Sequence, residues 1–419
     1  MRKLQTVNRM LKAIQSLTSG VFSRLIPRSN QVWVFGGNKG LRFADNSMFF
    51  FKYCAKHTDK TPVWLTRSDK VLDQVRSEGY LAHKTNSLSG LYYGFRAGWH
   101  IFDVSIGDTS VISSVGARHL NLWHGYPFKD IRRLRNSAQS AGAGFFKIIW
   151  NWLCNNPKNN SDYYVVHQNK QYLWQITESF DVKDENVVIA NYPRNIVFSP
   201  TASMEDVVSI SAKETNEKLE RIRANGKRVI GYFPTWRTGD EDQFMGTRCV
   251  DRINELNKFL ERNNLVIATK WHTCVFKEYE HDGVSETAEQ LNYAMNTLSN
   301  FIVLDFEQDL NSVINQCDVL VSDYSSVIVD YLLSGRPQVF MAYDLESYTE
   351  EWGFTFDYES FVPGPIVKTI DELMDTLAEY SRSPGSFSMQ HHAERAARRC
   401  ELFDTEIGSE TIFHFMDLR

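Results

Sequence analysis

The strongest constraint on the fold is the stretch Asp318–Tyr331, in which an apolar strand runs through a polar turn directly into an apolar helix. The strand covers Val319–Val321, the turn covers residues 322–326, and the helix covers Val327–Leu333. A short strand that feeds a helix in this way is half of a βαβ unit, and such units build parallel sheets.

The turn of this unit carries two hydroxyl groups, those of Ser325 and Ser326, at the start of the helix. Ligands of open α/β sheets bind outside the carboxyl ends of the strands. The free N–H groups and the dipole of a helix N-terminus favour an anion at such a position. The pattern predicts a phosphate site, although a serine that only caps the helix would leave the same pattern.

Strand-like and helix-like segments alternate along most of the chain, which predicts parallel sheets covered on both faces. The predicted strands are Val32–Phe35, Pro62–Thr66, Trp99–Val104, His119–Trp123, Tyr163–Val166, Val187–Ala190, Arg228–Phe233, Leu265–Thr269, Phe301–Leu304, Val319–Val321 and Gln338–Met341. The predicted helices are Asn46–Lys56, Val71–Glu78, Arg252–Arg262, Leu310–Gln316 and Val327–Leu333. Two Rossmann-like halves that face a central cleft are therefore expected.

The polar stretch 196–227 lacks a strand core and separates the two series of strands. We expect a basic amphipathic helix at 1–28, an N-terminal Rossmann-like domain at 29–195 and a linker with a surface helix at 196–227. A C-terminal Rossmann-like domain at 228–390 and closing helices at 391–419 complete the expected organisation.

The composition excludes several classes of protein. With 419 residues, 42% of them hydrophobic, the chain is globular, and a net charge of −5 gives no general attraction for nucleic acid. The six cysteines are far apart and do not combine with histidines at zinc-binding spacing, so free thiols and no metal site are expected. No apolar run approaches the roughly 20 residues that span a bilayer, and no secretory signal is apparent.

The first 28 residues have an unusual charge pattern. The first acidic residue of the chain is Asp45, and eight basic residues precede it. Apolar side chains from Leu4 to Leu25 recur at helical spacing, with basic and neutral polar residues between them. A basic amphipathic helix of this kind lies on anionic membrane surfaces, which predicts a peripheral protein at the cytoplasmic face of the membrane. The alternative is a helix that packs on its own domain.

A histidine, His124, directly follows the strand that ends at Trp123. Gly125 permits a tight turn after it, and Pro127 fixes the exit of the chain. With an ordinary pKa of about 6.5, such an imidazole can accept the proton of a hydroxyl group at neutral pH. A structural histidine that is hydrogen-bonded in a turn is the alternative.

Cationic side chains follow two strands of the second series. Arg237 lies beyond the strand that ends near Pro234 and Thr235, and Lys270 and His272 follow Leu265–Thr269. These groups suit a phosphoryl group and the charge that develops on it during transfer. For Arg237, an arginine on the surface is the alternative.

Two acidic residues, Asp344 and Glu346, follow the strand Gln338–Met341. In dinucleotide sites, acidic residues at this position accept hydrogen bonds from ribose hydroxyls. A solvated acidic loop is the alternative. Taken together, the strand ends offer groups that can bind a pyrophosphate and activate a hydroxyl.

In this order, the clusters resemble the CDP-glycerol glycerophosphotransferase family, which makes teichoic acids and capsules. The matching residues are Trp123, His124, Gly125, Pro127, Lys129, Tyr192–Asn195, Pro234–Arg237, Lys270, His272, Asp323–Ser326, Tyr343–Glu346, Tyr348, Gly353, Phe354, Phe356, Asp357 and Pro363–Pro365. The match covers roughly residues 120–370. Three positions depart from the family pattern: Tyr126 stands for a small threonine, Asn191 for a glycine and Thr273 for a proline.

The resemblance implies a GT-B fold, attachment to the membrane surface and a CDP-linked polyol phosphate as donor. It implies transfer of the polyol phosphate, with glycerol phosphate expected, to a hydroxyl of a lipid-linked or glycan acceptor, with release of CMP. CDP-glycerol is then a substrate, and no cofactor is expected.

The resemblance also assigns roles to residues. His124 and His272 would be catalytic, and the acceptor would meet Trp123, Gly125, Tyr126 and Arg194. The pyrophosphate would bind to Arg237, Lys270, Asp323, Ser325 and Ser326, and the nucleotide to Pro234, Thr235, Asp344 and Glu346.

Two other functions fit the same fold class: a glycosyltransferase with a sugar-nucleotide donor, and a membrane-bound assembly protein whose site has decayed. The sequence leaves open the acceptor, glycerol against ribitol phosphate, single addition against polymerisation, the oligomeric state and dependence on Mg²⁺.

Overall fold

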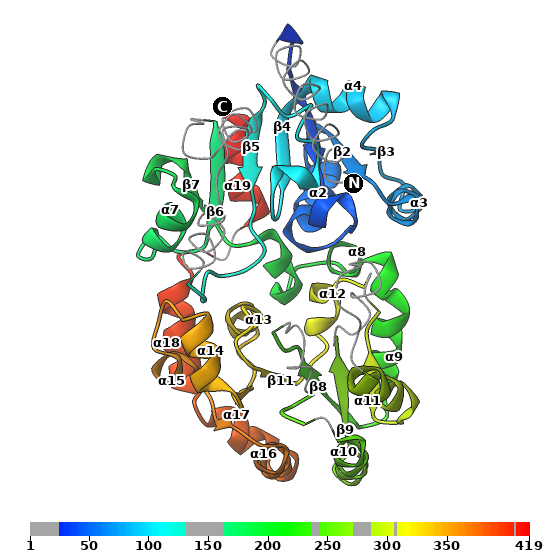
Figure 1. The fold of residues 1–419 in the computed structure, drawn as a ribbon, viewed down its shortest axis with the longest axis vertical. Helices are drawn as coiled ribbons and strands as arrows, with labels where there is room; N and C mark the ends of the chain where they lie inside the picture. The colour runs from blue at the N-terminus through cyan, green and yellow to red at the C-terminus, as the bar shows by residue number, and fades with distance from the viewer. Residues whose placement is uncertain are drawn as a thin grey trace, which may run out of the picture. The chain divides into compact units, whose positions relative to one another are not determined.

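The computed structural model describes residues 25–130, 162–235, 244–247, 249–270, 286–305, 308–405 and 408–419. The chain divides into two compact units, each with its own parallel sheet (Figure 1). The first unit comprises Met1–His124, Ile131–Ile196 and Phe403–Arg419, and the second comprises Gly125–Asp130 and Val197–Leu402.

The sheet of the first unit has seven strands in the order β3-β2-β1-β4-β5-β6-β7, and all neighbours run parallel. The strands are β1 (Ser29–Phe35), β2 (Thr61–Thr66), β3 (Ala82–Lys84), β4 (Ala97–Phe102), β5 (Arg118–Asn121), β6 (Tyr163–His167) and β7 (Val187–Ile189). Every residue of β4 and β6 is buried, because helices cover both faces of a parallel sheet.

Helices, two of them with serine caps, pack around this sheet. They are α2 (Asp45–His57), α3 (Asp69–Ser77), α4 (Leu88–Arg96), α7 (Trp174–Phe180) and α19 (Ser409–Asp417). Ser68 accepts a hydrogen bond from the Val71 N–H at the start of α3, and Ser87 does the same for Gly90 in α4. The last helix, α19, packs beside α2, so the end of the chain returns to the first unit (Figure 1).

The sheet of the second unit has six parallel strands in the order β10-β9-β8-β11-β12-β13. They are β8 (Arg228–Tyr232), β9 (Leu265–Thr269), β10 (Phe301–Val303), β11 (Val319–Ser322), β12 (Gln338–Met341) and β13 (Ile366–Val367). The α-helices of this unit are α8 (Met204–Val207), α9 (Lys213–Ala224), α10 (Val250–Arg262), α11 (Glu286–Thr297), α12 (Asn311–Ile314), α13 (Val327–Tyr331), α14 (Leu345–Glu351), α15 (Tyr358–Phe361), α16 (Ile370–Arg382), α17 (Pro384–Met389) and α18 (His392–Leu402).

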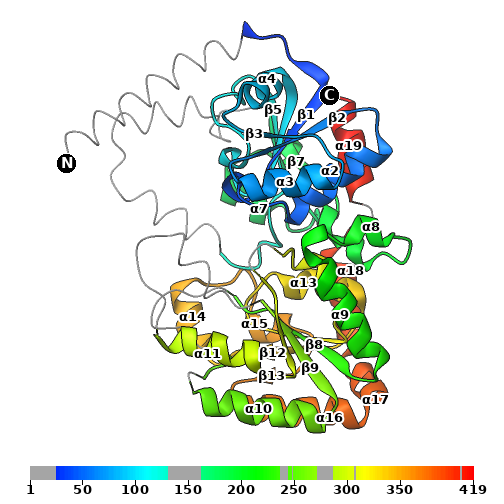
Figure 2. The ribbon, with the colours of Figure 1, turned by 90° about the vertical axis from the view of Figure 1, so that its right-hand side faces the viewer.

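The apolar faces of α10 and α16 pack on this second sheet and form its main core. Leu256 of α10 and Leu377 of α16 are fully buried in one cluster with Val319 and Val321 of β11. Figure 2 shows the two helices side by side below the strands. The amphipathic spacing of these helices therefore accounts for their place in the fold.

The predicted α/β class with two Rossmann-like sheets is confirmed, and every predicted strand is present. Two edge strands, β3 and β13, were not predicted. The strand expected at His119–Trp123 ends at Asn121, which places Trp123 and His124 in the turn beyond it. Of the helix predicted at 1–28, residues 1–24 lie outside the described part of the chain.

Two further properties concern the described residues alone. The four cysteines among them, Cys54, Cys249, Cys317 and Cys400, are free, in agreement with the prediction of free thiols. None of the helices in that part of the chain is long and apolar enough to cross a membrane.

Arg28 anchors the N-terminal end of the first unit. Its guanidinium donates to four backbone carbonyls, those of Gly94 at 3.0 Å, Ala97 at 3.3 Å, Ser113 at 3.0 Å and Val115 at 2.6 Å. Burial lowers the pKa of Arg28 to about 10, which leaves the group charged at neutral pH. The planar fork of arginine can meet several acceptors at once, whereas a lysine ammonium cannot do so with the same geometry.

We expect Arg28→Ala to lower the free energy of unfolding by about 2–3 kcal/mol, because hydrogen bonds of a charged donor to several carbonyls are lost together. Chemical denaturation measures this loss. Arg96→Ala is the matched control, because Arg96 makes one such bond, at 2.5 Å to the Pro27 carbonyl. Equal losses in the two variants would show that Arg28 is not the anchor of this region.

Candidate functional site

His124 lies in the turn after β5, at the carboxyl end of the first sheet. The preceding residue, Trp123, has a left-handed backbone with φ of 57°, which is unusual for a bulky residue. The Trp123 N–H donates to the side-chain oxygen of Asn121 at 2.9 Å, and the indole packs on the imidazole with 4.0 Å between ring centroids. The turn that carries His124 is thus held in a strained conformation.

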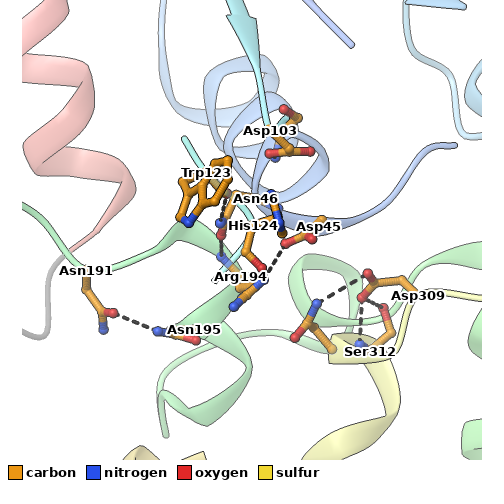
Figure 3. Close-up of polar contacts among 12 residues, drawn as sticks. Asp45, Asn46, Asp103, Trp123, His124, Asn191, Arg194, Asn195, Asp309 and Ser312 are labelled. Atoms are coloured by element: carbon orange, nitrogen blue, oxygen red, sulfur yellow. Dashed lines mark hydrogen bonds and ion pairs between the residues drawn. The ribbon is translucent and has the colours of Figure 1, made fainter. Parts of the chain in front are cut away.

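Three segments meet around this turn, and Arg194 joins them (Figure 3). Its Nη1 atom lies 2.7 Å from the Asp45 carboxylate and 2.7 Å from the His124 carbonyl oxygen. The Arg194 N–H donates to the Asn46 side chain at 3.1 Å, and the Asn46 amide donates to the Trp123 carbonyl at 2.7 Å. The carbonyl oxygens of Trp123 and His124 therefore each accept a hydrogen bond from a side chain.

The electrostatic surroundings keep His124 neutral at pH 7. The protein around it lowers its pKa below the ordinary histidine value of 6.5 by desolvation, while the charge of Asp45 raises it and that of Arg194 lowers it. A backbone hydrogen bond with Asp103 and the charge of Asp108 also raise this pKa. The side chain keeps an exposed surface, so water moderates the desolvation. A neutral, accessible imidazole is the form that a general base requires.

Two buried carboxyl groups near His124 belong to Asp103 and Asp108. Desolvation raises the pKa of each, and for Asp103 the charges of Asp45 and Asp108 add to the shift. The Asp108 carboxylate accepts hydrogen bonds from several backbone N–H groups, the shortest from Lys39 at 2.7 Å and Val104 at 2.8 Å. Asp108 thus orders the loops at this end of the sheet.

In the second unit, the turn after β11 is fixed by three consecutive side chains. Ser322 donates to the Phe233 carbonyl at 2.7 Å, and buried Asp323 accepts the Thr235 N–H at 2.7 Å. Tyr324 donates to the Asp344 carboxylate at 2.8 Å, and burial together with Asp344 raises the pKa of this tyrosine. The carboxyl ends of β8, β11 and β12 are joined in this way.

Ser325 and Ser326 follow these three residues at the start of α13. Ser326 occupies the N-cap position of α13 without capping it by its side chain. Both serines are half-buried, and neither hydroxyl makes a hydrogen bond to any other described residue. The simple capping interpretation is therefore not supported, and both hydroxyls remain able to donate to a ligand.

The segment Gly125–Asp130, directly after His124, packs within the second unit. Tyr126 is buried and stacks on Phe356, and Lys129 pairs with Phe354 in an antiparallel bridge. The Lys129 ammonium lies 3.4 Å from the Thr235 hydroxyl and 5.4 Å from the centre of the Tyr348 ring. Lys129 therefore brings a positive charge to the carboxyl end of β8.

Some of the remaining predicted residues lie in the described part of the chain, and two lie outside it. Lys270 is buried and donates to the Gln308 carbonyl, and Glu346 is exposed in the first turn of α14. Pro234 and Thr235 follow the end of β8, and the Thr235 N–H bonds to Asp323. Arg237 and His272 lie outside the described residues.

Sequence reasoning did not select Asp45, Asn46 or Asp103, which surround His124. Asp45 and Asn46 read as the first turn of a helix, and their contacts with Trp123 and Arg194 join residues distant in sequence. An asparagine and an aspartate ahead of three consecutive phenylalanines, Phe49–Phe51, give no local sign of this role. Lys129 was noted only as part of the family resemblance.

Comparison with known proteins identifies the family. Residues 20–412 match the sequence model of the CDP-Glycerol:Poly(glycerophosphate) glycerophosphotransferase family. The chain belongs to this family of transferases, which confirms the resemblance found in the sequence.

Curated relatives agree with this assignment. A teichoic acid glycerol-phosphate transferase of Staphylococcus aureus is 25% identical over 394 residues, which cover 91% of this chain and 92% of that protein. The teichoic acid ribitol-phosphate polymerase TarL of the same species is 33% identical over 201 residues, or 48% of this chain and 32% of that protein.

A solved structure supports the fold. The wall teichoic acid polymerase TagF superposes with a TM-score of 0.68 at 18% identity, over 100% of this chain and 95% of that chain. This likeness concerns the fold, and it confirms the predicted GT-B-like class.

Proposed function

We propose that this transferase moves a polyol phosphate, glycerol phosphate in the first place, from a CDP-linked donor to an acceptor hydroxyl during synthesis of a teichoic acid or a related capsular polymer. The observation that carries the proposal is the match to the glycerophosphotransferase family over residues 20–412. The glycerol-phosphate transferase that aligns over nine-tenths of the chain supports glycerol over ribitol.

In the proposed reaction, His124 acts as the general base. The acceptor oxygen attacks the phosphorus that carries the polyol, and its proton passes to the imidazole. The bond from this phosphorus to the oxygen shared with the second phosphorus breaks, and CMP leaves with the electron pair. The neutral imidazole and its ordered backbone support this role. Such a base contributes about 10²–10⁴-fold to the rate.

The donor pyrophosphate would bind to Ser325 and Ser326, whose hydroxyls make no hydrogen bond to another described residue, together with Arg237, His272 and Lys270. Asp323 would order the backbone of this site, since its carboxylate accepts the Thr235 N–H. The nucleotide would lie against Pro234, Thr235, Asp344 and Glu346. Lys129 adds a cation beside Thr235, where it can offset phosphate charge.

The purified protein and a panel of donors test the proposal. CDP-glycerol, CDP-ribitol, a UDP-sugar and a GDP-sugar are each offered with lipid-linked glycan acceptors of defined length. We expect CMP to appear with CDP-glycerol and the acceptor to gain one or more glycerol phosphate masses. Release of UDP or GDP would support a glycosyltransferase instead, and no turnover with any donor would support a decayed assembly protein.

Replacement of His124 tests the base. We expect His124→Ala to lower kcat by about a hundredfold or more with little change in donor affinity, because the base acts on the acceptor. His414→Ala, at an exposed histidine of α19, is the matched control. In the unmodified enzyme, the acid limb of the kcat/KM profile should lie below the ordinary histidine pKa. Near-normal turnover of His124→Ala would remove His124 from the reaction.

The serine pair tests the phosphate site. We expect Ser325→Ala with Ser326→Ala to weaken CDP-glycerol binding by about 1.5–3 kcal/mol for each lost hydrogen bond to charged oxygen, and to leave cytidine binding unchanged. Calorimetry gives both affinities. The melting temperature should hold, because neither hydroxyl caps α13. Ser334→Ala, whose hydroxyl donates to the Tyr331 carbonyl, is the control. Equal losses for the two ligands would make the turn purely structural.

We also propose that the protein works at an anionic membrane surface, where a lipid-linked acceptor would be found. Residues 1–24 contain five basic residues and no acidic one. Arg28 and Arg96 fasten the chain that follows to the end of α4. On α4, Leu88 is 89% exposed and Tyr92 is 61% exposed one turn later. Exposed apolar side chains beside basic ones suit a lipid interface.

Truncation tests this surface. We expect removal of residues 1–24 to reduce flotation with anionic vesicles in a salt-sensitive way, since each basic residue contributes about 1 kcal/mol there. Leu88→Ser with Tyr92→Ser should reduce it further without salt dependence. Tyr293→Ser, at a 74% exposed tyrosine of α11, is the control. Unchanged flotation together with a lower melting temperature would mean that the first residues pack on the protein instead.

A further inference from the structure

The first residue of α2, Asp45, has an unusual backbone and a carboxylate that the helix does not need as a cap. Its φ of 61° lies in the left-handed region, and the N-cap position belongs to Ala44, which makes no side-chain cap bond. This conformation is uncommon for residues other than glycine, although aspartate adopts it more often than most. Strain of this kind persists where the surrounding contacts fix it, and it concentrates at functional sites.

The contacts that fix Asp45 also fix His124. Arg194 places one nitrogen 2.7 Å from the Asp45 carboxylate and 2.7 Å from the His124 carbonyl, and its side chain is only 6% exposed. A charged partner stabilises a buried guanidinium, since an unpaired charge in the interior is costly. Without the carboxylate of Asp45, Arg194 would lose the ion pair that holds its side chain against the His124 carbonyl.

Asn46 completes the link between the helix and the turn. It is fully buried, and its amide donates to the Trp123 carbonyl while its oxygen accepts the Arg194 N–H. The Asp45 carboxylate accepts the Asn46 N–H at 2.8 Å, so the two residues are ordered together. Figure 3 shows Asp45, Asn46 and Arg194 grouped around the turn that carries His124.

The charges around the imidazole give Asp45 a second effect. The groups that face His124 are Asp45 from α2, Arg194 from the turn after β7, and Asp103 and Asp108 from the loops after β4. Among the charged groups, Asp45 has the largest effect, and it favours the imidazolium. The other two carboxyl groups are buried, and desolvation disfavours their charged forms.

We propose that Asp45 is a positioning residue for His124: it holds Arg194 against the backbone of the histidine, and its negative charge stabilises the imidazolium that forms when His124 takes the acceptor proton. The inference rests on the proposed function, because it concerns the base of that reaction. The proton moves from the acceptor hydroxyl to the imidazole alone.

Asp45→Asn in the full-length protein tests the proposal. The asparagine oxygen can still accept the Asn46 N–H, so α2 should form as before. We expect the pKa of His124, followed by NMR of labelled histidines, to fall by about 0.5–1 pH unit, because a favourable negative charge is lost. The acid limb of kcat/KM should move to lower pH by the same amount. We expect kcat to fall about tenfold, less than in His124→Ala. Asp45→Glu should recover part of the loss.

Asp69→Asn is the matched control, because Asp69 also begins a helix of the first unit and pairs with a basic side chain, Lys84. If any negative charge at the start of a helix had this effect, Asp69→Asn and Asp45→Asn would change the pKa of His124 and kcat equally. An unshifted His124 resonance in Asp45→Asn overturns the inference even when His124→Ala is inactive. Full turnover of His124→Ala defeats the proposed base instead, so the two failures can be told apart.

Discussion

The buried guanidinium of Arg194 is the interaction on which the site of the first unit depends. It brings together the start of α2, the turn after β5 and the turn after β7, which are remote from each other in the sequence. A charge in such a place is tolerated only because a carboxylate and carbonyl oxygens surround it. The family resemblance implies that Arg194 meets the acceptor, and this assignment stays a prediction; in the structure its Nη1 atom bonds to Asp45 and to the His124 carbonyl.

The site of the second unit follows a different principle. Ser322, Asp323 and Tyr324 each bond to a residue at a neighbouring strand end, whereas the hydroxyls of Ser325 and Ser326 make no hydrogen bond to another described residue. Ser322, Asp323 and Tyr324 thus fix the backbone of the turn that carries Ser325 and Ser326. Preorganised donors of this kind lose little entropy when an anion binds.

Most of the fold could be predicted from the sequence, because buried parallel strands are short apolar runs that helices separate. The strands β3 and β13 escaped prediction, since Ala82–Lys84 and Ile366–Val367 are too short to show a pattern. His124, Ser325 and Ser326 could be selected because they follow strand ends. Asp45 and Asn46 could not, since their importance comes from tertiary contacts with Trp123 and Arg194 that no local spacing reveals.

The central claim is that the acceptor attacks the donor directly while His124 removes its proton. The most direct measurement is the stereochemistry of transfer from CDP-glycerol that is made chiral at the glycerol-bearing phosphorus with isotopes of oxygen and sulfur. A single in-line displacement predicts inversion at phosphorus in the product. Retention would require two displacements through a covalent glycerophosphoryl-enzyme, and it would contradict direct attack of the acceptor on the donor.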